Sequence, residues 1–268
     1  MGKKINIGNC SICGERCALS YEHVPPKKAF NNMRVNAYSI DEMLSGSELP
    51  WDMTGKKAKI LQKGSGAYTL CDTCNNNTGT WYGKDYVDFI SGIHNAISQH
   101  QYGPGASFQI EATDVYPLRI FKQILAMFCS VNGSGFGEDF HEYLLNKENC
   151  QFDVEKYKLS IYICGQVHIQ TGICVKGDIS TNSFRTVSEI AHYPLGYVLD
   201  FDTKSECSGC DITTFSQCAY EQKANVILTL PVLEHNTGFP LDYRSKSEII
   251  DCIEESKKHT ELEDIANE

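Results

Sequence analysis

Two Cys-x-x-Cys pairs, Cys10–Cys13 and Cys71–Cys74, constrain the fold of this chain more than any other feature of its sequence. Each pair can turn two thiolates toward one ion, and four sulfurs at about 2.3 Å complete a tetrahedral zinc site. Such a closed site has no open coordination position, so its ion stabilises the fold and does not catalyse a reaction. The sequence therefore predicts an N-terminal module that is held together by a structural zinc ion.

The cysteine content supports this interpretation once the compartment is considered. The sequence has no run of about 18 apolar residues, as a transmembrane helix needs, and no apolar segment follows its basic start. We therefore expect a cytoplasmic protein without a membrane segment. In a reducing compartment, paired cysteines more often bind metal than form disulfides. A third pair, Cys207–Cys210, is followed by Cys218 but lacks an obvious fourth ligand, and we expect ordinary reduced thiols there.

Charge is unevenly distributed along the 268 residues. Residues 1–110 contain 11 Lys and Arg against 9 Asp and Glu, whereas the remaining residues contain 13 against 25, a balance of −12. Two glycines flank Pro104, and this breaker is the best candidate for a domain boundary. We expect an N-terminal module of residues 1–105 and an acidic domain of residues 106–268. The acidity of the second part disfavours contact with nucleic acid and favours a protein partner, self-association or a small ligand.

Apolar periodicity predicts the secondary structure of both parts. In the module, apolar residues recur at spacings of three and four between 85 and 100, which is typical of an amphipathic helix. In the second part we predict two helices followed by a mostly antiparallel sheet. The helices are expected at 118–131 and 140–145, the strands at 159–175, 196–201 and 224–230, and a closing helix at 247–268. The predicted fold class is α+β.

Side chains with useful chemistry lie close to both cysteine pairs. His23 lies ten residues after Cys13, and Glu22 precedes it directly. Asn75 follows the second pair and opens a run of three asparagines. One zinc ion bound by both pairs would bring a carboxylate, an imidazole and an amide together.

This segment, about residues 8–85, resembles the HNH endonucleases, the ββα-metal or His-Me finger nucleases, in their zinc-stapled form with two such cysteine pairs. In that family an acidic residue and a histidine, followed by an apolar residue and a proline, end a β-hairpin, and a Cys-Asn begins the following helix. Glu22-His23-Val24 with Pro26, or with its neighbour Pro25, matches the first element, and Leu70-Cys71 with Cys74-Asn75 matches the second. The resemblance implies a treble-clef-like ββα-metal module ahead of the mixed α+β domain.

The resemblance also implies a role for each residue. His23 would be the general base that takes a proton from water, and Glu22 and Asn75 would hold one divalent cation against the scissile phosphate. Asn76 and Asn77 compete with Asn75 because the triple asparagine leaves the register open. Oxygen ligands favour Mg²⁺ or Mn²⁺, and phosphodiester hydrolysis needs an activated water and a cation that neutralises developing charge. The implied function is endonuclease cleavage of nucleic acid, chiefly DNA, as occurs in restriction, phage defence and mobile elements.

The match departs from the family pattern in three places. The family's middle asparagine, which orients the histidine, usually lies shortly before the second cysteine pair, where this chain has residues 64–68 without an asparagine. Ser65, Tyr68 or a backbone carbonyl are the alternatives for orienting His23. Residues 30–62 are more than the compact motif needs, so we expect an insertion there that shapes a substrate groove. Thr78 stands where the family often has a lysine.

Lysines supply the expected contacts to nucleic acid. Lys56, Lys57 and Lys59 lie in a stretch, 53–68, that has no carboxylate, and Lys27 and Lys28 follow the histidine motif. These five are the predicted phosphate contacts, and the alternative for the stretch is a solvated strand face. The rival to a nuclease is a non-catalytic zinc module that binds nucleic acid or a protein partner, with the acidic domain as a sensor or docking domain.

Overall fold

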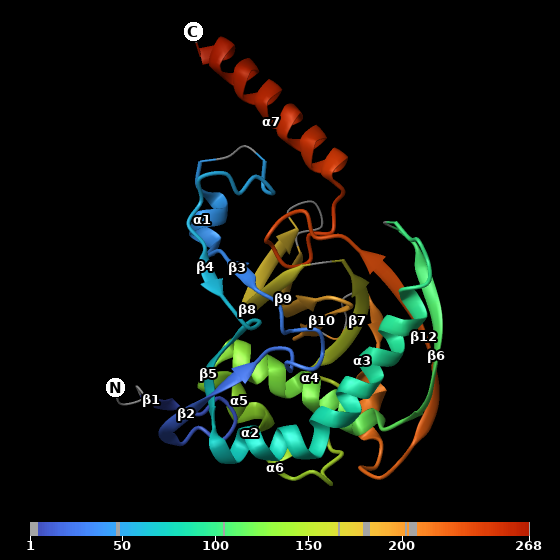
Figure 1. Ribbon diagram of the computed structural model, residues 1–268. Helices are drawn as coiled ribbons and strands as arrows, with labels where there is room; N and C mark the ends of the chain where they lie inside the picture. The colour runs from blue at the N-terminus through green and yellow to red at the C-terminus, as the bar shows by residue number, and fades with distance from the viewer. Residues whose placement is uncertain are drawn as a thin grey trace.

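A computed structural model describes residues 5–46, 49–103, 105–165, 167–178, 183–201, 203 and 208–267 (Figure 1). Within these residues the chain forms three β-sheets, of three, two and seven strands. Helices pack against the three-stranded and the seven-stranded sheet. The fold is thus mixed α and β, as the sequence predicts.

The three-stranded sheet surrounds both cysteine pairs. β1 (Asn6–Asn9) and β2 (Arg16–His23) form an antiparallel hairpin whose turn carries the first pair. β5 (Gly66–Cys71) pairs antiparallel with the other edge of β2, and α2 (Asp72–Thr78) follows it directly. The helix continues through a π-helical turn, η1 (Gly79–Gly83), into α3 (Lys84–Ile97). The helix predicted over 85–100 is therefore confirmed, with its end at Ile97.

Between β2 and β5, residues 30–62 form an arm that leaves this sheet. The arm contains β3 (Val35–Ala37), α1 (Ile40–Leu44) and β4 (Lys59–Leu61), and β3 pairs antiparallel with β4. In Figure 1 the arm extends away from β1 and β2 along one side of the molecule. It occupies the position of the predicted insertion.

The remaining strands belong to one seven-stranded sheet. They are β6 (Ser107–Val115), β7 (Lys158–Cys164), β8 (His168–Asp178), β9 (Ser183–His192), β10 (Leu195–Asp200), β11 (Cys210–Asp211) and β12 (Ala224–Leu233). Their order is β6-β12-β7-β10-β9-β8, with β11 also beside β7. The pairing of β12 with β7 is parallel and the others are antiparallel. The predicted mostly antiparallel sheet is confirmed.

Two parts of the strand prediction are wrong. The single strand expected over 159–175 is two strands, β7 and β8, which are separated by a turn at Gly165 and, within the sheet, by β10 and β9. The sheet also begins before the two helices, because β6 precedes them. In β6, exposed residues alternate with more buried ones, and the strand pairs with β12, which lies far along the chain. The local sequence therefore contains no continuous apolar run that would predict this strand. β9 carries Arg185 and Glu189 within its length, which interrupts its apolar pattern.

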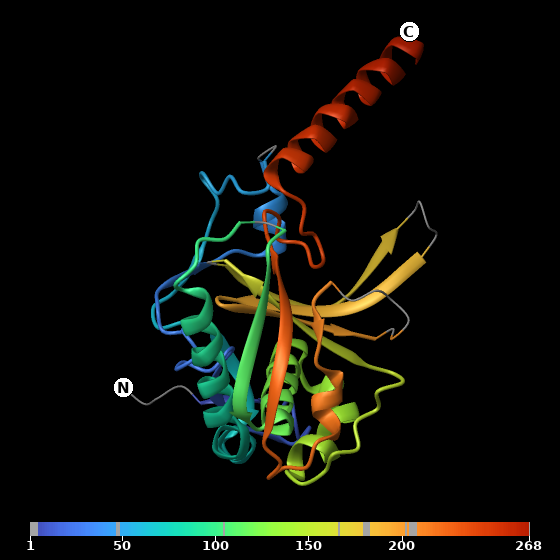
Figure 2. The same ribbon diagram turned by 90° about the vertical axis from the view of Figure 1, so that its right-hand side faces the viewer.

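Helix α4 (Pro117–Asn132) is the centre of the core. Thirteen of its 16 residues are buried, so it is covered on nearly all sides, by α3, by η1 and by the large sheet. Figure 2 shows α3 beside the long β6–β12 pair, with α4 nearby. The helices predicted over 118–131 and 140–145 are confirmed. The short helices around α4 are α5 (Ser134–Gly137), η2 (Glu138–Phe140), α6 (His141–Leu145) and η3 (Thr213–Gln217).

Buried apolar residues form one large core that includes both sides of position 105, among them Leu70, Ile90, Phe121 and Ile161. A smaller cluster, which includes Tyr162, lies on the other face of the seven-stranded sheet. β7 contributes alternate residues to the two clusters, because successive side chains of a strand point to opposite faces. The N-terminal module therefore shares its core with the rest of the chain.

The last helix, α7 (Lys246–Asn267), projects from the body of the molecule (Figures 1 and 2). Ile249, near its start, is buried against that body. The closing helix predicted over 247–268 is confirmed to within one residue at each end. In the part of the chain that the structure describes, no helix has the length and apolar character needed to cross a membrane.

Candidate functional site

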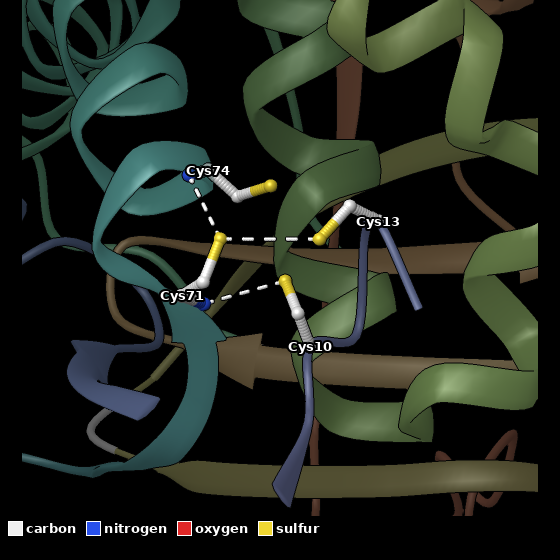
Figure 3. Close-up of side chains that lie close together, drawn as sticks. All are labelled: Cys10, Cys13, Cys71 and Cys74. Carbon is white, nitrogen blue, oxygen red and sulfur yellow. Dashed lines mark hydrogen bonds between the residues drawn. The ribbon is translucent and has the colours of Figure 1, made fainter. Parts of the chain in front are cut away.

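The four cysteines of the two predicted pairs come together at one point (Figure 3). Their Sγ atoms all lie within 4.8 Å of one another, and Cys13 Sγ and Cys71 Sγ are 3.9 Å apart. Four sulfurs at about 2.3 Å from a tetrahedral zinc ion are about 3.8 Å from each other. The described cysteines are all free of disulfides, and Cys207 of the third pair lies outside the described residues. Cys10, Cys13, Cys71 and Cys74 therefore fit a metal ion such as zinc.

Local backbone geometry turns each pair toward the cluster. In the first pair, Gly14 has a φ of +72° and its N–H donates to Cys10 O at 2.9 Å, which closes the turn between β1 and β2. In the second pair, Cys71 caps α2, and its Sγ accepts a hydrogen bond from Cys74 N at 3.3 Å. Cys10 Sγ accepts a hydrogen bond from Cys71 N at 3.3 Å. Hydrogen bonds to sulfur favour the thiolate, and the pKa of Cys10 is lowered to about 4, chiefly by the Cys74 thiol.

Residues from beyond position 105 pack directly on the first cysteine pair. His141 Nδ1 lies 3.1 Å from Ile12 O. Gly137 lies so close to Ser11 that a Cβ at position 137 would be 1.8 Å from Ser11 O. Loss of the metal is therefore expected to disturb α5 and α6 as well as the three-stranded sheet.

His23 ends β2, where a backbone carbonyl holds its ring. Its Nε2 lies 3.1 Å from Lys63 O. Since a carbonyl oxygen can only accept a hydrogen bond, Nε2 carries the proton of the neutral ring and Nδ1 carries the lone pair. The Tyr21 ring packs edge-on against the imidazole, with 5.0 Å between the ring centroids. Of the three predicted alternatives for orienting His23, the structure shows the backbone carbonyl.

Asn31 fixes the turn that carries this carbonyl, and the sequence analysis missed it. Its buried Nδ2 donates to Pro25 O and to Ser65 O, both at 2.7 Å, and Oδ1 accepts from Ser65 N at 2.7 Å. Gly64, in the same turn, has a φ of +95°, and a Cβ there would lie 2.1 Å from Asn31 O. The family resemblance points to an asparagine just before the second cysteine pair, whereas this one lies eight residues after His23.

Asn75 lies against β2, where its Nδ2 donates to Ser20 Oγ at 3.0 Å. The pairing of β2 with β5 shifts register between Ser20 and Tyr21, just before Glu22. Glu22 and His23 are adjacent on the strand, so their side chains point to opposite faces, and the structure does not bring the three predicted residues to one face. Asn76 is exposed on α2, whereas Asn75 hydrogen-bonds to the strand. Burial raises the pKa of Glu22 to about 7.

Comparisons of the chain with protein-family models, with curated proteins and with solved structures found no match. These comparisons therefore assign neither the chain nor its β2–β5–α2 arrangement to a known family.

The lysines predicted to contact phosphate differ in exposure and in whether their ammonium groups already donate a hydrogen bond. Lys27, Lys28, Lys57 and Lys59 are exposed. Lys56 is half-buried, and its Nζ donates to Met43 O at 2.6 Å, which ties two parts of the arm together. Lys56 therefore has a structural contact, and the other four lysines lie at the surface.

The arm forms one wall of a groove of about 840 Å³. β8 and residues 235–240 contribute the other wall, and Ser65 lines the groove where it meets the end of the three-stranded sheet. The segment predicted as an insertion at 30–62 thus shapes a groove beside His23.

A buried polar network behind this groove also escaped the sequence analysis. The Glu189 carboxylate accepts hydrogen bonds from the Tyr162 hydroxyl, from the Tyr243 hydroxyl at 2.8 Å and from Leu241 N at 2.8 Å. His235 lines the groove, and its Nε2 lies 3.3 Å from the same carboxylate. Burial opposes ionisation, but the hydrogen bonds, led by that of His235, outweigh it and lower the pKa of Glu189. These residues share no local motif, so only the folded chain reveals them.

Proposed function

We propose that this protein is a zinc-stapled HNH-type endonuclease that hydrolyses phosphodiester bonds in nucleic acid, chiefly DNA. The observation that carries the proposal is the position of His23 at the end of a hairpin that the four-cysteine cluster joins to the helix bearing Asn75. His23 is the proposed general base. Glu22 and Asn75 are the proposed ligands of a divalent cation, with Asn76 as the alternative to Asn75.

The contact with Lys63 supports the role of His23. Because Nε2 of the neutral ring donates to the carbonyl, Nδ1 is left with a lone pair that can accept a proton from water. The residue is only half-buried, so water and a phosphate group can reach it. After the proton moves from water to Nδ1, the remaining hydroxide attacks the phosphorus and the sugar oxygen leaves.

Glu22 offers a carboxylate on β2, and Asn75 offers an amide oxygen on α2. Burial raises the pKa of Glu22 to about 7, so the charged carboxylate is disfavoured unless a positive charge lies beside it. Mg²⁺ or Mn²⁺ bound there would neutralise the charge that develops on the phosphate and the leaving oxygen.

The proposal is tested by incubating purified protein, after its zinc content is confirmed by elemental analysis, with supercoiled plasmid. Wild type should nick or linearise the plasmid when Mg²⁺ or Mn²⁺ is added, and not without a divalent cation. His23→Ala should cut about 10² to 10⁴ times more slowly, which is the usual contribution of a general base. His100→Ala, which removes an exposed imidazole beyond the end of α3, is the matched control and should cut at the wild-type rate.

Two outcomes would contradict the proposal. One is a zinc-loaded, folded wild type that cuts neither plasmid nor single-stranded circles with either cation, which favours the non-catalytic zinc module. The other is a His23→Ala protein that retains its zinc and cuts at the wild-type rate.

A further inference from the structure

The groove beside the arm is lined by aliphatic side chains together with aromatic rings and amides, and its described lining carries no formal charge. Asn36, Tyr38 and Trp51 line it on the arm side, and Gln170 and His235 line it on the sheet side. Of the lining residues that the structure describes, none carries a carboxylate, an ammonium or a guanidinium group. A neutral lining of this kind does not attract phosphates, but it suits planar, uncharged rings with amide-like edges.

One cation has a contact with this lining: Lys246 Nζ lies 5.1 Å from the centroid of the Trp51 ring. Charged residues of both signs are near neighbours of the lining in sequence, the basic Arg34 and Lys63 and the acidic Asp41, Glu42 and Asp52. The match to a nucleotide therefore depends on the neutral lining with its rings and amides, and on Lys246 beside Trp51.

The groove also lies next to the proposed catalytic site. Ser65 lines the groove, and its carbonyl accepts a hydrogen bond from Val24 N at 3.1 Å, one residue from His23. Gln170 lines the groove as well, and its Nε2 donates to Val24 O at 2.6 Å. A strand whose scissile phosphate lies at His23 would therefore have its neighbouring nucleotides at this groove.

We propose that the groove binds unpaired nucleotides of the strand that the His23 site cuts, with bases stacked on Tyr38 and Trp51. The identity of that strand rests on the proposed function. A duplex is a poor occupant, because its bases are stacked on one another and its outer surface presents phosphates. A volume of about 840 Å³ is also that of a site for a small ligand. The preferred substrate is thus single-stranded, or a duplex opened beside the scissile phosphate.

Binding is measured without cleavage, using full-length protein that carries His23→Ala and a fluorescently labelled single-stranded oligonucleotide. Adding Trp51→Ala should weaken binding about tenfold, which is the typical effect of losing one stacked base. Adding Asn36→Asp places a carboxylate in the neutral lining and should weaken binding by a similar factor. Asn32→Asp makes the same charge change at an exposed residue outside the lining, and should have little effect. Asn36→Asp keeps the test decisive if Trp51→Ala does not fold.

Weaker binding by Trp51→Ala and Asn36→Asp but not by Asn32→Asp supports the proposal. Equal effects of Asn36→Asp and Asn32→Asp, or tighter binding of a duplex of the same sequence, would overturn it. Competition by free mononucleotides at the same concentration of bases would also overturn it, since the occupant would then be a free nucleotide.

The two proposals fail separately. If the groove variants weaken binding but wild type cuts nothing, the groove assignment stands and the nuclease falls. If wild type cuts while binding is insensitive to Trp51 and Asn36, the nuclease stands and the groove assignment falls.

Discussion

The three-stranded sheet and the seven-stranded sheet are held in different ways. In the first, β1, β2, β5 and α2 meet at four cysteines whose sulfurs lie within 4.8 Å of one another. In the second, the strands enclose α4, most of whose residues are buried. A few side chains therefore determine the geometry of the first region, and distributed burial determines that of the second. Residues with proposed chemistry lie in the first region, and the second supports it from behind through Gly137 and His141.

The largest expected effect is on the first region. Cys71→Ser removes one ligand of the cluster, and we expect the free energy of unfolding to fall by more than about 3 kcal/mol, since structural zinc contributes on the order of 10 kcal/mol. Thermal unfolding followed by circular dichroism, with elemental analysis for zinc, checks this. Cys17→Ser, beside the cluster but outside it, is the control and should keep both zinc and stability. A Cys71→Ser protein as stable as wild type would show that the metal does not hold this region.

Destabilising the second region should leave the metal bound in the first. Lys122 is fully buried in α4, and its Nζ donates to Tyr143 O at 2.7 Å, to Asn146 O at 2.8 Å and to Lys147 O at 3.2 Å. Lys122→Met leaves the buried Tyr143 carbonyl and the two less buried carbonyls without this donor, and should cost about 3 kcal/mol of stability. Urea unfolding measures the loss. Glu142→Gln, an exchange near the same helix end, should change stability by less than about 0.5 kcal/mol.

Zinc content distinguishes the two effects. Lys122→Met should retain one zinc ion per chain when folded, whereas Cys71→Ser should not. A Lys122→Met protein that loses zinc before it unfolds would show that the two regions are not held independently.

Glu189→Gln tests the second region through the pH dependence of its unfolding free energy. The substitution breaks the network of His235, Tyr162 and Tyr243, and we expect a loss of about 2 kcal/mol near neutral pH. Hydrogen bonds hold the pKa of Glu189 below its usual 4.5, so the carboxylate stabilises the fold above that pH. This stabilisation is lost as pH falls through the lowered pKa. The gap in unfolding free energy between wild type and Glu189→Gln should therefore narrow on acidification, and a gap that widens would contradict the assignment.

The smallest expected effect on stability comes from Asn31. Its contribution to stability and its proposed role in orienting His23 can be measured separately. Asn31→Ala removes the hydrogen bonds that hold the turn at Ser65, and should cost about 1 to 2 kcal/mol. Because the same turn presents Lys63 O to His23, plasmid nicking should slow about tenfold at unchanged zinc content. Asn32→Ala, at the exposed neighbouring position, should change neither quantity. Nicking by Asn31→Ala at the wild-type rate would show that the turn does not orient His23.

The sequence predicts local features of this molecule well. The four metal ligands follow from spacing, because each pair lies within one turn, and the helices at α3, α4 and α7 follow from apolar periodicity over many residues.

Long-range features could not be predicted, for a physical reason. β6 pairs with β12, and the alternation of polar and apolar residues in one strand does not specify its distant partner. Asn31 holds its turn only because Ser65, far along the chain, folds back onto it. The partners of Glu189 come from separate segments of the chain. In the sequence alone, its charge therefore only interrupts the apolar pattern of a strand.

The central claim is that Nδ1 of His23 accepts the proton of the attacking water, and chemical rescue tests it most directly. The rate of plasmid nicking in Mg²⁺ would be measured for zinc-loaded His23→Ala with increasing concentrations of free imidazole. We predict that nicking is nearly lost without imidazole and rises with its concentration, while wild type is unaffected. Nicking by His23→Ala at the wild-type rate without imidazole would contradict the claim.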